Sequence, residues 1–404
     1  MNTFSVLYRY ECKKLFQKKM VWVCLILCIM ATLMSCFADL IGDVYIDGER
    51  IDNNYHYMMT DITYMKELNG RAIDQTLLEK MVAAYRQIPD IPGRHYISSE
   101  EYQQIARPYS DIYNFVRLTT ILQSSQIMYE WEPDEQEFYQ MQKDFFEEDW
   151  SLLRLTEDEK QFWRNQRAKI ETPMVYQECY TYSKLYSIFQ GIGFFALLMQ
   201  AICLAGVFSD EYSRRTDQLN LCTVNGRKGL YWAKLLAGIS FAGGTSLLLA
   251  ILSFISVMIL YGKGNPSALL QFAFRFSAGA LSCGQALLIA DGLMIVTVIL
   301  VAVFTMFLSE LTHSNVATLS IVGSLLTLAM ITNIPESLRV LSQLWLWLPF
   351  NILSVYHIFN AYTLPLFGMH LTAWQALPFI YLTVGVGLVL IGKKIYRGRQ
   401  ISGR

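Results

Sequence analysis

The chain has 404 residues, of which 53% are hydrophobic and only 17% are charged, a composition that excludes an ordinary soluble protein of two or three domains. The net charge of −1 hides two unlike parts: residues 39–184 hold 27 acids and 15 bases, whereas the remaining residues hold 7 acids and 18 bases. The sequence has no basic stripe interleaved with aromatic residues, so nucleic acid is not an expected partner.

Cysteine and histidine usage gives no indication of a metal site. The eight cysteines lie mostly in or beside apolar stretches, without CxxC pairs or a zinc-like spacing with the five scattered histidines. We therefore expect the cysteines to pack as small hydrophobic side chains and the chain to bind no metal.

Residues 1–19 alternate basic and apolar side chains, which is typical of a cytoplasmic amphipathic helix lying in the membrane interface. The apolar positions are Phe4, Leu7, Tyr8, Leu15 and Phe16. A basic flank that only orients the next segment also fits Lys13 to Lys19, and the two interpretations stay open.

Residues 20–38 form an apolar segment long enough for a first membrane span. A cleaved secretory signal is the alternative. Residues 1–19 precede the segment, Glu11 is among them, and no small-residue cleavage site follows. We predict an uncleaved anchor.

Residues 39–184 are long enough to bury a core, and we predict an extracellular, mainly helical domain. Ser98 with Glu101 and Thr156 with Glu159 fit capping boxes, and residues 133–135 fit another helix start. The fourteen tyrosines of this segment fit either helix packing or an amphipathic surface for a peptide or lipid-like substrate.

Five further segments are apolar enough to be membrane helices, and they bring the expected number of spans to six. They are residues 185–208, 235–260, 288–308, 316–331 and 374–391. Six spans place the basic clusters of the N-terminus, of residues 214–234 and of a basic tail at 392–404 on one side. The positive-inside rule makes this side the cytoplasm, with both termini in it.

Residues 332–373 contain one more apolar stretch, at 340–360. A seventh span here would place the basic C-terminus outside, and Pro349 interrupts the stretch. We therefore expect an extracellular loop with re-entrant or interfacial helices, with Trp345 and Trp347 at headgroup level.

No nucleotide-binding or catalytic motif stands out in the sequence, so we do not expect this chain to be an enzyme or to hold a cofactor. Asp291 is the one acid clearly inside an apolar run, and an intramembrane charge is by default a functional candidate. Its place near the expected outer end of a span also fits an ordinary interfacial acid.

Residues 209–234 form a polar loop between two spans, and this loop resembles that of the ABC-2 type permeases, the membrane subunits of many bacterial export-type ABC transporters. The residues that carry the resemblance are Phe208, Glu211, Thr216, Leu219, Leu221, Arg227 and Lys234. Arg215 and Val224 depart from the glycine and proline of the family pattern. The family fold is an all-α membrane protein with six transmembrane helices.

The resemblance implies a division of labour between two kinds of subunit. A separate cytoplasmic ATPase would bind ATP and Mg²⁺ and dock on a coupling helix in residues 210–227. The residues expected to couple to it are Glu211, Arg214, Arg215, Thr216 and Arg227. A second permease subunit, identical or a sister, would complete the path in the bacterial plasma membrane.

The expected activity is export of a hydrophobic or amphipathic molecule, such as an antimicrobial peptide, a drug or a lipid. A second interpretation is a membrane sensor or mechanical transmitter whose outside domain binds a ligand or an envelope partner. A membrane enzyme is a third interpretation, and no group of residues in the sequence supports it.

Overall fold

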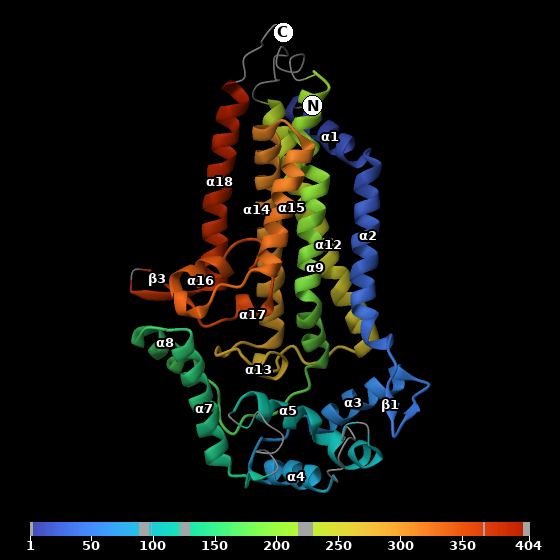
Figure 1. The fold of residues 1–404 in the computed structure, drawn as a ribbon, viewed down its shortest axis with the longest axis vertical. Coiled ribbons are helices and arrows are strands. Elements are labelled where there is room, and N and C mark those ends of the chain that lie inside the picture. The colour runs from blue at the N-terminus through green and yellow to red at the C-terminus, as the bar shows by residue number, and fades with distance from the viewer. Residues whose placement is uncertain are drawn as a thin grey trace.

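The computed structural model describes residues 3–88, 97, 99–120, 122, 130–216, 229–366 and 368–398. Long helices stand side by side in a bundle, and a polar domain formed by residues 41–179 covers one end of it (Figure 1). We call this the domain end of the bundle. The opposite end carries helix α1 (Thr3–Phe16), and we call it the α1 end.

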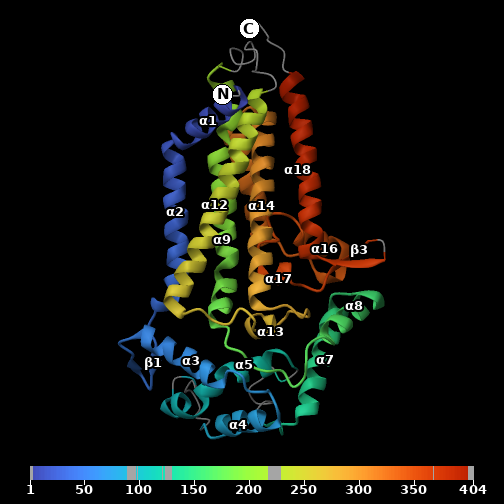
Figure 2. The ribbon, with the colours of Figure 1, turned by 180° about the vertical axis from the view of Figure 1, so that it is seen from behind.

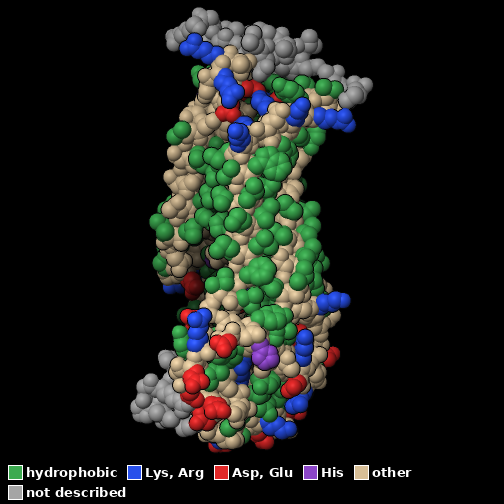
Figure 3. Space-filling model, turned by 90° about the vertical axis from the view of Figure 1, so that its right-hand side faces the viewer, with side chains coloured by type: hydrophobic (Ala, Val, Ile, Leu, Met, Phe, Trp, Pro, Cys, Tyr) green, Lys and Arg blue, Asp and Glu red, His purple; other side chains and the backbone are tan. Residues whose placement is uncertain are grey.

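Within the described ranges, five helical segments are long and apolar enough to cross a membrane. They are α2 (Lys19–Phe37) with the short η1 (Ala38–Leu40), α9 (Tyr180–Leu204) continued by α10 (Gly206–Ser213), α12 (Gly229–Tyr261), α14 (Cys283–Thr312) and α18 (Ala373–Gly398). The chain is a multi-pass membrane protein and mostly helical, and both predictions are confirmed at this level. Large apolar side chains cover the face between the two ends (Figure 3).

Helix α15 (Asn315–Ile331) is apolar but short. Its 17 residues measure about 26 Å, less than the roughly 30 Å of a hydrocarbon core. A bend of 118° separates it from η5 (Glu336–Leu338) and α16 (Arg339–Leu346). The pair is a broken span or a re-entrant segment, so the six-span topology stays a prediction.

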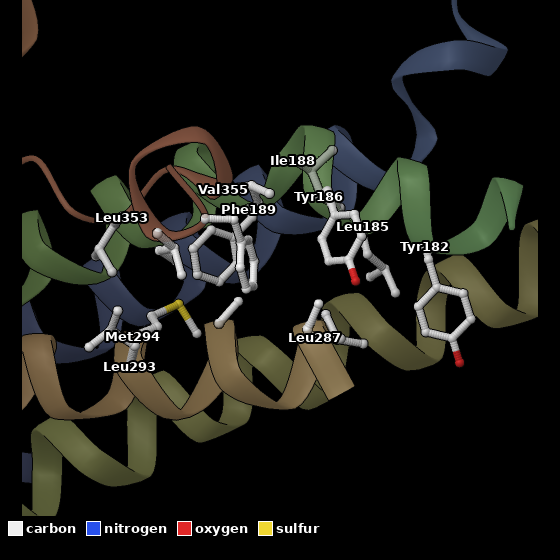
Figure 4. Close-up of a cluster of buried hydrophobic side chains, with 14 of the residues drawn as sticks. Tyr182, Leu185, Tyr186, Ile188, Phe189, Leu287, Leu293, Met294, Leu353 and Val355 are labelled. Carbon is white, nitrogen blue, oxygen red and sulfur yellow. The ribbon is translucent and has the colours of Figure 1, made fainter. Parts of the chain in front are cut away.

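Helix α14 is the centre of the bundle, in contact with α9, α12, α15 and α18. Small buried side chains such as Ala286, Ala290 and Ala302 let its neighbours approach closely. Figure 4 shows the apolar packing beside α14. Side chains of α9 and α14 meet Leu353 and Val355, which belong to the chain segment between α16 and α18.

The chain between α16 and α18 lies against the half of the bundle nearer the domain (Figures 1 and 2). It contains the one-turn helix α17 (Val355–Ile358) and an antiparallel hairpin of β3 (Thr363–Leu366) and β4 (Met369–Thr372). Thr363 pairs with Thr372 in the hairpin register.

The polar domain is built mainly of helices. They are α3 (Asn54–Leu68), α4 (Gln75–Arg86), the single turns η3 (Tyr102–Ala106) and η4 (Arg107–Tyr109), α5 (Ser110–Leu118), α7 (Glu135–Leu152) and α8 (Glu157–Arg167), with a small hairpin of β1 (Tyr45–Ile46) and β2 (Glu49–Arg50). The capping box of Thr156 and Glu159 is confirmed, and Asp134 caps α7. Ser98 lies outside the described residues.

Helix α8 joins the polar domain to the segment between α16 and α18. The carboxylate of Glu159, which is 1% exposed, accepts from Thr363 Oγ1 at 2.9 Å and also pairs with Arg339. One turn further on, Trp163 Nε1 donates to Ala361 O at 2.7 Å. Since these contacts are buried, domain and bundle move together at this junction unless hydrogen bonds and an ion pair are broken.

We expect Gly193→Ala to be destabilising relative to Gly191→Ala in the same helix. A Cβ at Gly193 would lie 3.0 Å from Leu353 Cβ, whereas one at Gly191 meets nothing within 4 Å. Both changes give α9 the same gain in helix propensity, so their difference isolates an overpacking penalty of about 1–3 kcal/mol. Thermal unfolding of the purified variants in detergent measures it. Equal midpoints would contradict the described packing of Leu353 on α9.

Asp149 on α7 predicts a pH dependence of stability. Burial raises the pKa of Asp149 to about 6, and the carboxylate of Glu336 adds to the effect. The folded protein therefore binds more protons than the unfolded chain between about pH 4 and 6, so this group makes stability fall as pH rises through that range.

We expect Asp149→Asn to reduce this loss, because an amide resembles the protonated acid. The measurement is the unfolding midpoint at pH 4.5, 5.5 and 7, values chosen to bracket roughly this window. Glu148→Gln, at an exposed position next to it on α7, is the control. An Asp149→Asn profile that parallels the wild type would refute the assignment.

Candidate functional site

Acidic and basic side chains meet inside the α1 end of the bundle. Helix α9 is continued there by α10, which carries Asp210 and Glu211 in succession. Neighbouring positions on a helix point about 100° apart, so the two carboxylates face different partners. The close approach of the Asp210 carboxylate, 2.7 Å from a Cβ placed at Gly206, explains why α10 begins with a glycine.

Glu211 lies between two lysines. Its Oε1 accepts from Lys14 Nζ of α1 and from Lys234 Nζ of α12, each at 2.7 Å. Lys234 also donates to Val207 O at 2.8 Å, and its side chain is 0% exposed. Glu11 Oε2 lies 3.8 Å from both lysine nitrogens. We call these four side chains, Glu11, Lys14, Glu211 and Lys234, the ion cluster.

Asp210 makes a second set of contacts beside the ion cluster. Its Oδ2 accepts from Lys18 Nζ at 2.6 Å, and its Oδ1 accepts from the side-chain amide of Asn315 at the start of α15. Ser209 is hydrogen-bonded to Asn315 and lies 3.1 Å, oxygen to oxygen, from Ser309 of α14. Helix α10 is thus tied to α1, α12, α14 and α15 at one level of the bundle.

The ion cluster is electrically balanced, with two carboxylates facing two ammonium groups. Burial opposes the charge of Lys14, but the charge and hydrogen bond of Glu211 outweigh it, so the pKa of Lys14 is raised. Ions removed from water are stable only when they are paired and hydrogen-bonded. The cluster therefore acts as an electrostatic clamp on three helices.

The structure separates the predicted coupling residues into two groups. Glu211 is buried in the ion cluster, whereas Arg214 and Arg215 are exposed just beyond α10. Thr216 is half-buried and its backbone N–H donates to Glu211 O at 2.9 Å. Arg227 lies outside the described residues, as do residues 217–226 of the predicted coupling segment.

Sequence reasoning missed the partners of Glu211 in α1. Glu11 entered only as an argument against a signal peptide, Lys14 was placed in a basic flank or an interfacial helix, and Asp210 and Asn315 were not selected. A signal was present: outside residues 39–184 the chain has only seven acids, and three of them, Glu11, Asp210 and Glu211, meet here. Acids that are rare in an apolar region need buried partners.

Asp291 lies away from the ion cluster, in the part of α14 nearer the domain end. Its half-buried side chain lines a small cavity with Leu185, Phe189 and Ser253. Among the described residues, no basic side chain lies within 4 Å of its carboxylate. The structure does not join Asp291 to the predicted coupling residues.

Groups able to hold a metal are not found among the described residues, and the seven cysteines described there are free, six of them buried. The ion cluster contains no hydroxyl or thiol group, and each of its carboxylates faces a cation. Its arrangement suits holding helices together better than acid–base chemistry. No protein-family model and no curated protein matches the chain.

We expect Glu211→Gln to destabilise the protein more than Lys234→Met does. Without the Glu211 carboxylate, the fully buried Lys234 loses its nearest counter-charge, at a cost of about 3–5 kcal/mol. In Lys234→Met the Glu211 carboxylate still has Lys14 as its ion-pair partner.

Unfolding midpoints of the detergent-purified variants provide the measurement, with Arg215→Gln as an exposed control. A smaller effect for Glu211→Gln than for Lys234→Met would show that Glu211 is not the centre of the ion cluster.

Proposed function

We propose that this chain is the permease subunit of an ATP-binding-cassette exporter whose ATPase is a separate cytoplasmic protein. One observation carries the proposal. The ion cluster fixes α10 to α1 and α12 close to Ser213, where α10 ends, and to Gly229, where α12 begins. A force applied at these two helix ends is passed directly to two long helices and to α1.

In the proposed topology the α1 end is cytoplasmic. Helix α1 and the last turn of α18 lie at the same end (Figure 1), which requires an even number of crossings. Counting the bent pair of α15 and α16 as the sixth span meets that requirement. Basic side chains gather at the α1 end (Figure 3), in agreement with the positive-inside rule, and the polar domain is then extracellular.

The two groups of predicted coupling residues then have different tasks. Exposed Arg214 and Arg215 are available for charge-assisted contacts with acidic groups of an ATPase. Buried Glu211 holds α10 in place and does not touch the partner itself. Thr216 supports the turn that follows α10 through its bonds to Glu211 O.

We infer a pair of permease subunits, identical or sister chains, that moves a hydrophobic or amphipathic molecule. Wide apolar faces support this inference, because α2, α15 and α18 keep large side chains exposed in the single chain. Such faces need lipid or a second subunit as a neighbour. The proposed site of action is the bacterial plasma membrane.

The test is recovery of an ABC ATPase with the affinity-tagged chain from native membranes. We expect the double variant Arg214→Glu/Arg215→Glu to reduce that recovery about tenfold, equivalent to about 1.4 kcal/mol, without changing the unfolding midpoint. Lys394→Glu/Arg397→Glu, which reverses two exposed charges on α18, is the matched control.

If no ATPase is recovered with the wild-type chain, the proposal is wrong. ATP hydrolysis by the recovered complex without movement of any substrate in proteoliposomes would favour the mechanical transmitter instead. Equal recovery with both double variants would remove Arg214 and Arg215 from the docking surface.

A further inference from the structure

A cavity of about 510 Å³ lies between α7 and α8 of the polar domain, far from the ion cluster. Its apolar wall includes Trp150, Ile170 and Met174, and its polar wall includes Gln142 and Arg167. Small-molecule sites have volumes of roughly 300–1,000 Å³ and combine an apolar lining with a few polar groups. This cavity has both properties.

Arg167 determines which chemistry the cavity favours. The guanidinium carbon lies 3.9 Å from the centroid of the Phe146 ring, and Nη2 donates to the neutral Gln142 Oε1 at 3.0 Å. Burial lowers the pKa of Arg167 to about 10. In the part of the chain that the structure describes, Nη1 has no hydrogen-bond partner and no carboxylate forms an ion pair with Arg167.

The carboxylates around the cavity and Arg164 already have partners, whereas Lys143, the third cation of the lining, is exposed to solvent. Glu147 accepts from Arg164 at 2.6 and 2.9 Å, and Asp144 accepts from Gln140 at 2.9 Å. The indole Nε1 of Trp150, a side chain that is 1% exposed, is a second donor without a partner among the described residues. Two side chains of the cavity wall thus each carry a donor without an acceptor among the described residues, and buried groups of this kind cost free energy while they stay unpaired.

We propose that this cavity binds a small amphipathic carboxylate, with the acid group on Arg167 and the apolar part against Trp150, Ile170 and Met174. A guanidinium presents two parallel N–H groups that match the two oxygens of a carboxylate. A phosphate group, with three terminal oxygens and more charge, is favoured where several cations converge. Here the neighbouring Arg164 is occupied by Glu147 and Glu157, and Lys143 is exposed to solvent. This site does not depend on transport or on an ATPase.

The test is isothermal titration calorimetry on the full-length protein in nanodiscs. The probes are N-acetyl-L-phenylalanine and N-acetyl-L-leucine, each compared with its uncharged amide. We expect each acid to bind at least about tenfold more tightly than its amide, which is about 1.4 kcal/mol. Arg167→Gln should remove that preference, because glutamine keeps a donor but not the charge.

Two further variants separate loss of the site from loss of the fold. Arg154→Gln changes an exposed arginine that does not line the cavity, and it should bind as the wild type does. Ala168→Phe adds a ring at an exposed position of the cavity wall, and it should weaken binding of acids and amides alike. Equal affinity of acid and amide, no binding of either acid, or an unchanged preference in Arg167→Gln would each overturn the proposal.

Discussion

Compensation of buried charge is the constraint on which the α1 end depends. Lys234 has no solvent to screen its ammonium group, and the effective penalty of such burial is several kcal/mol per ion. Glu211, 2.7 Å away, offsets that penalty only while α10 stays against α12. Lys14 extends the same requirement to α1, so that three segments distant in sequence are held in one arrangement.

Different interactions hold the bundle together along its length. In the middle, α14 relies on small side chains and close apolar packing, since lipid offers no hydrophobic force between helices. At the domain end, Lys184 pairs with Asp39 at 2.7 Å, and Tyr261 donates to Cys36 O at 3.0 Å. Ion pairs thus occupy the two ends, where water is near. The apolar middle depends mainly on dispersion, and the buried hydrogen bond from Gln200 Nε2 to Thr245 Oγ1, at 3.3 Å, adds to it.

Sequence patterns predicted the coarse fold because each relied on a local property. Apolar length identifies a membrane helix, and the spacing of Thr156 and Glu159 identifies a helix start, whatever lies elsewhere in the chain. The ion cluster was beyond such reasoning, because Lys14 and Glu211 are 197 positions apart and only the packing of α1 on α12 brings them together. The break after α15 was equally hidden, since hydropathy gives no information on a bend of 118°.

Helix α9, continued by α10, connects the two ends of the molecule, so a displacement at one end affects contacts at the other. Helix α9 begins where Glu178 and Thr181 bond to the polar domain and to the turn after α12, and it runs straight into α10 with Glu211. A helix resists compression along its axis, because its backbone hydrogen bonds are all made internally. A displacement of α10 is therefore not absorbed within α9, so it must alter either the ion cluster or the contacts at the domain end. The contacts at the domain end include the start of α9 and the buried junction of Glu159 and Trp163, which lie on different helices. Motion of α9 relative to the segment between α16 and α18 would strain the polar domain between them, and α8, which carries that junction, also lines the cavity of Arg167.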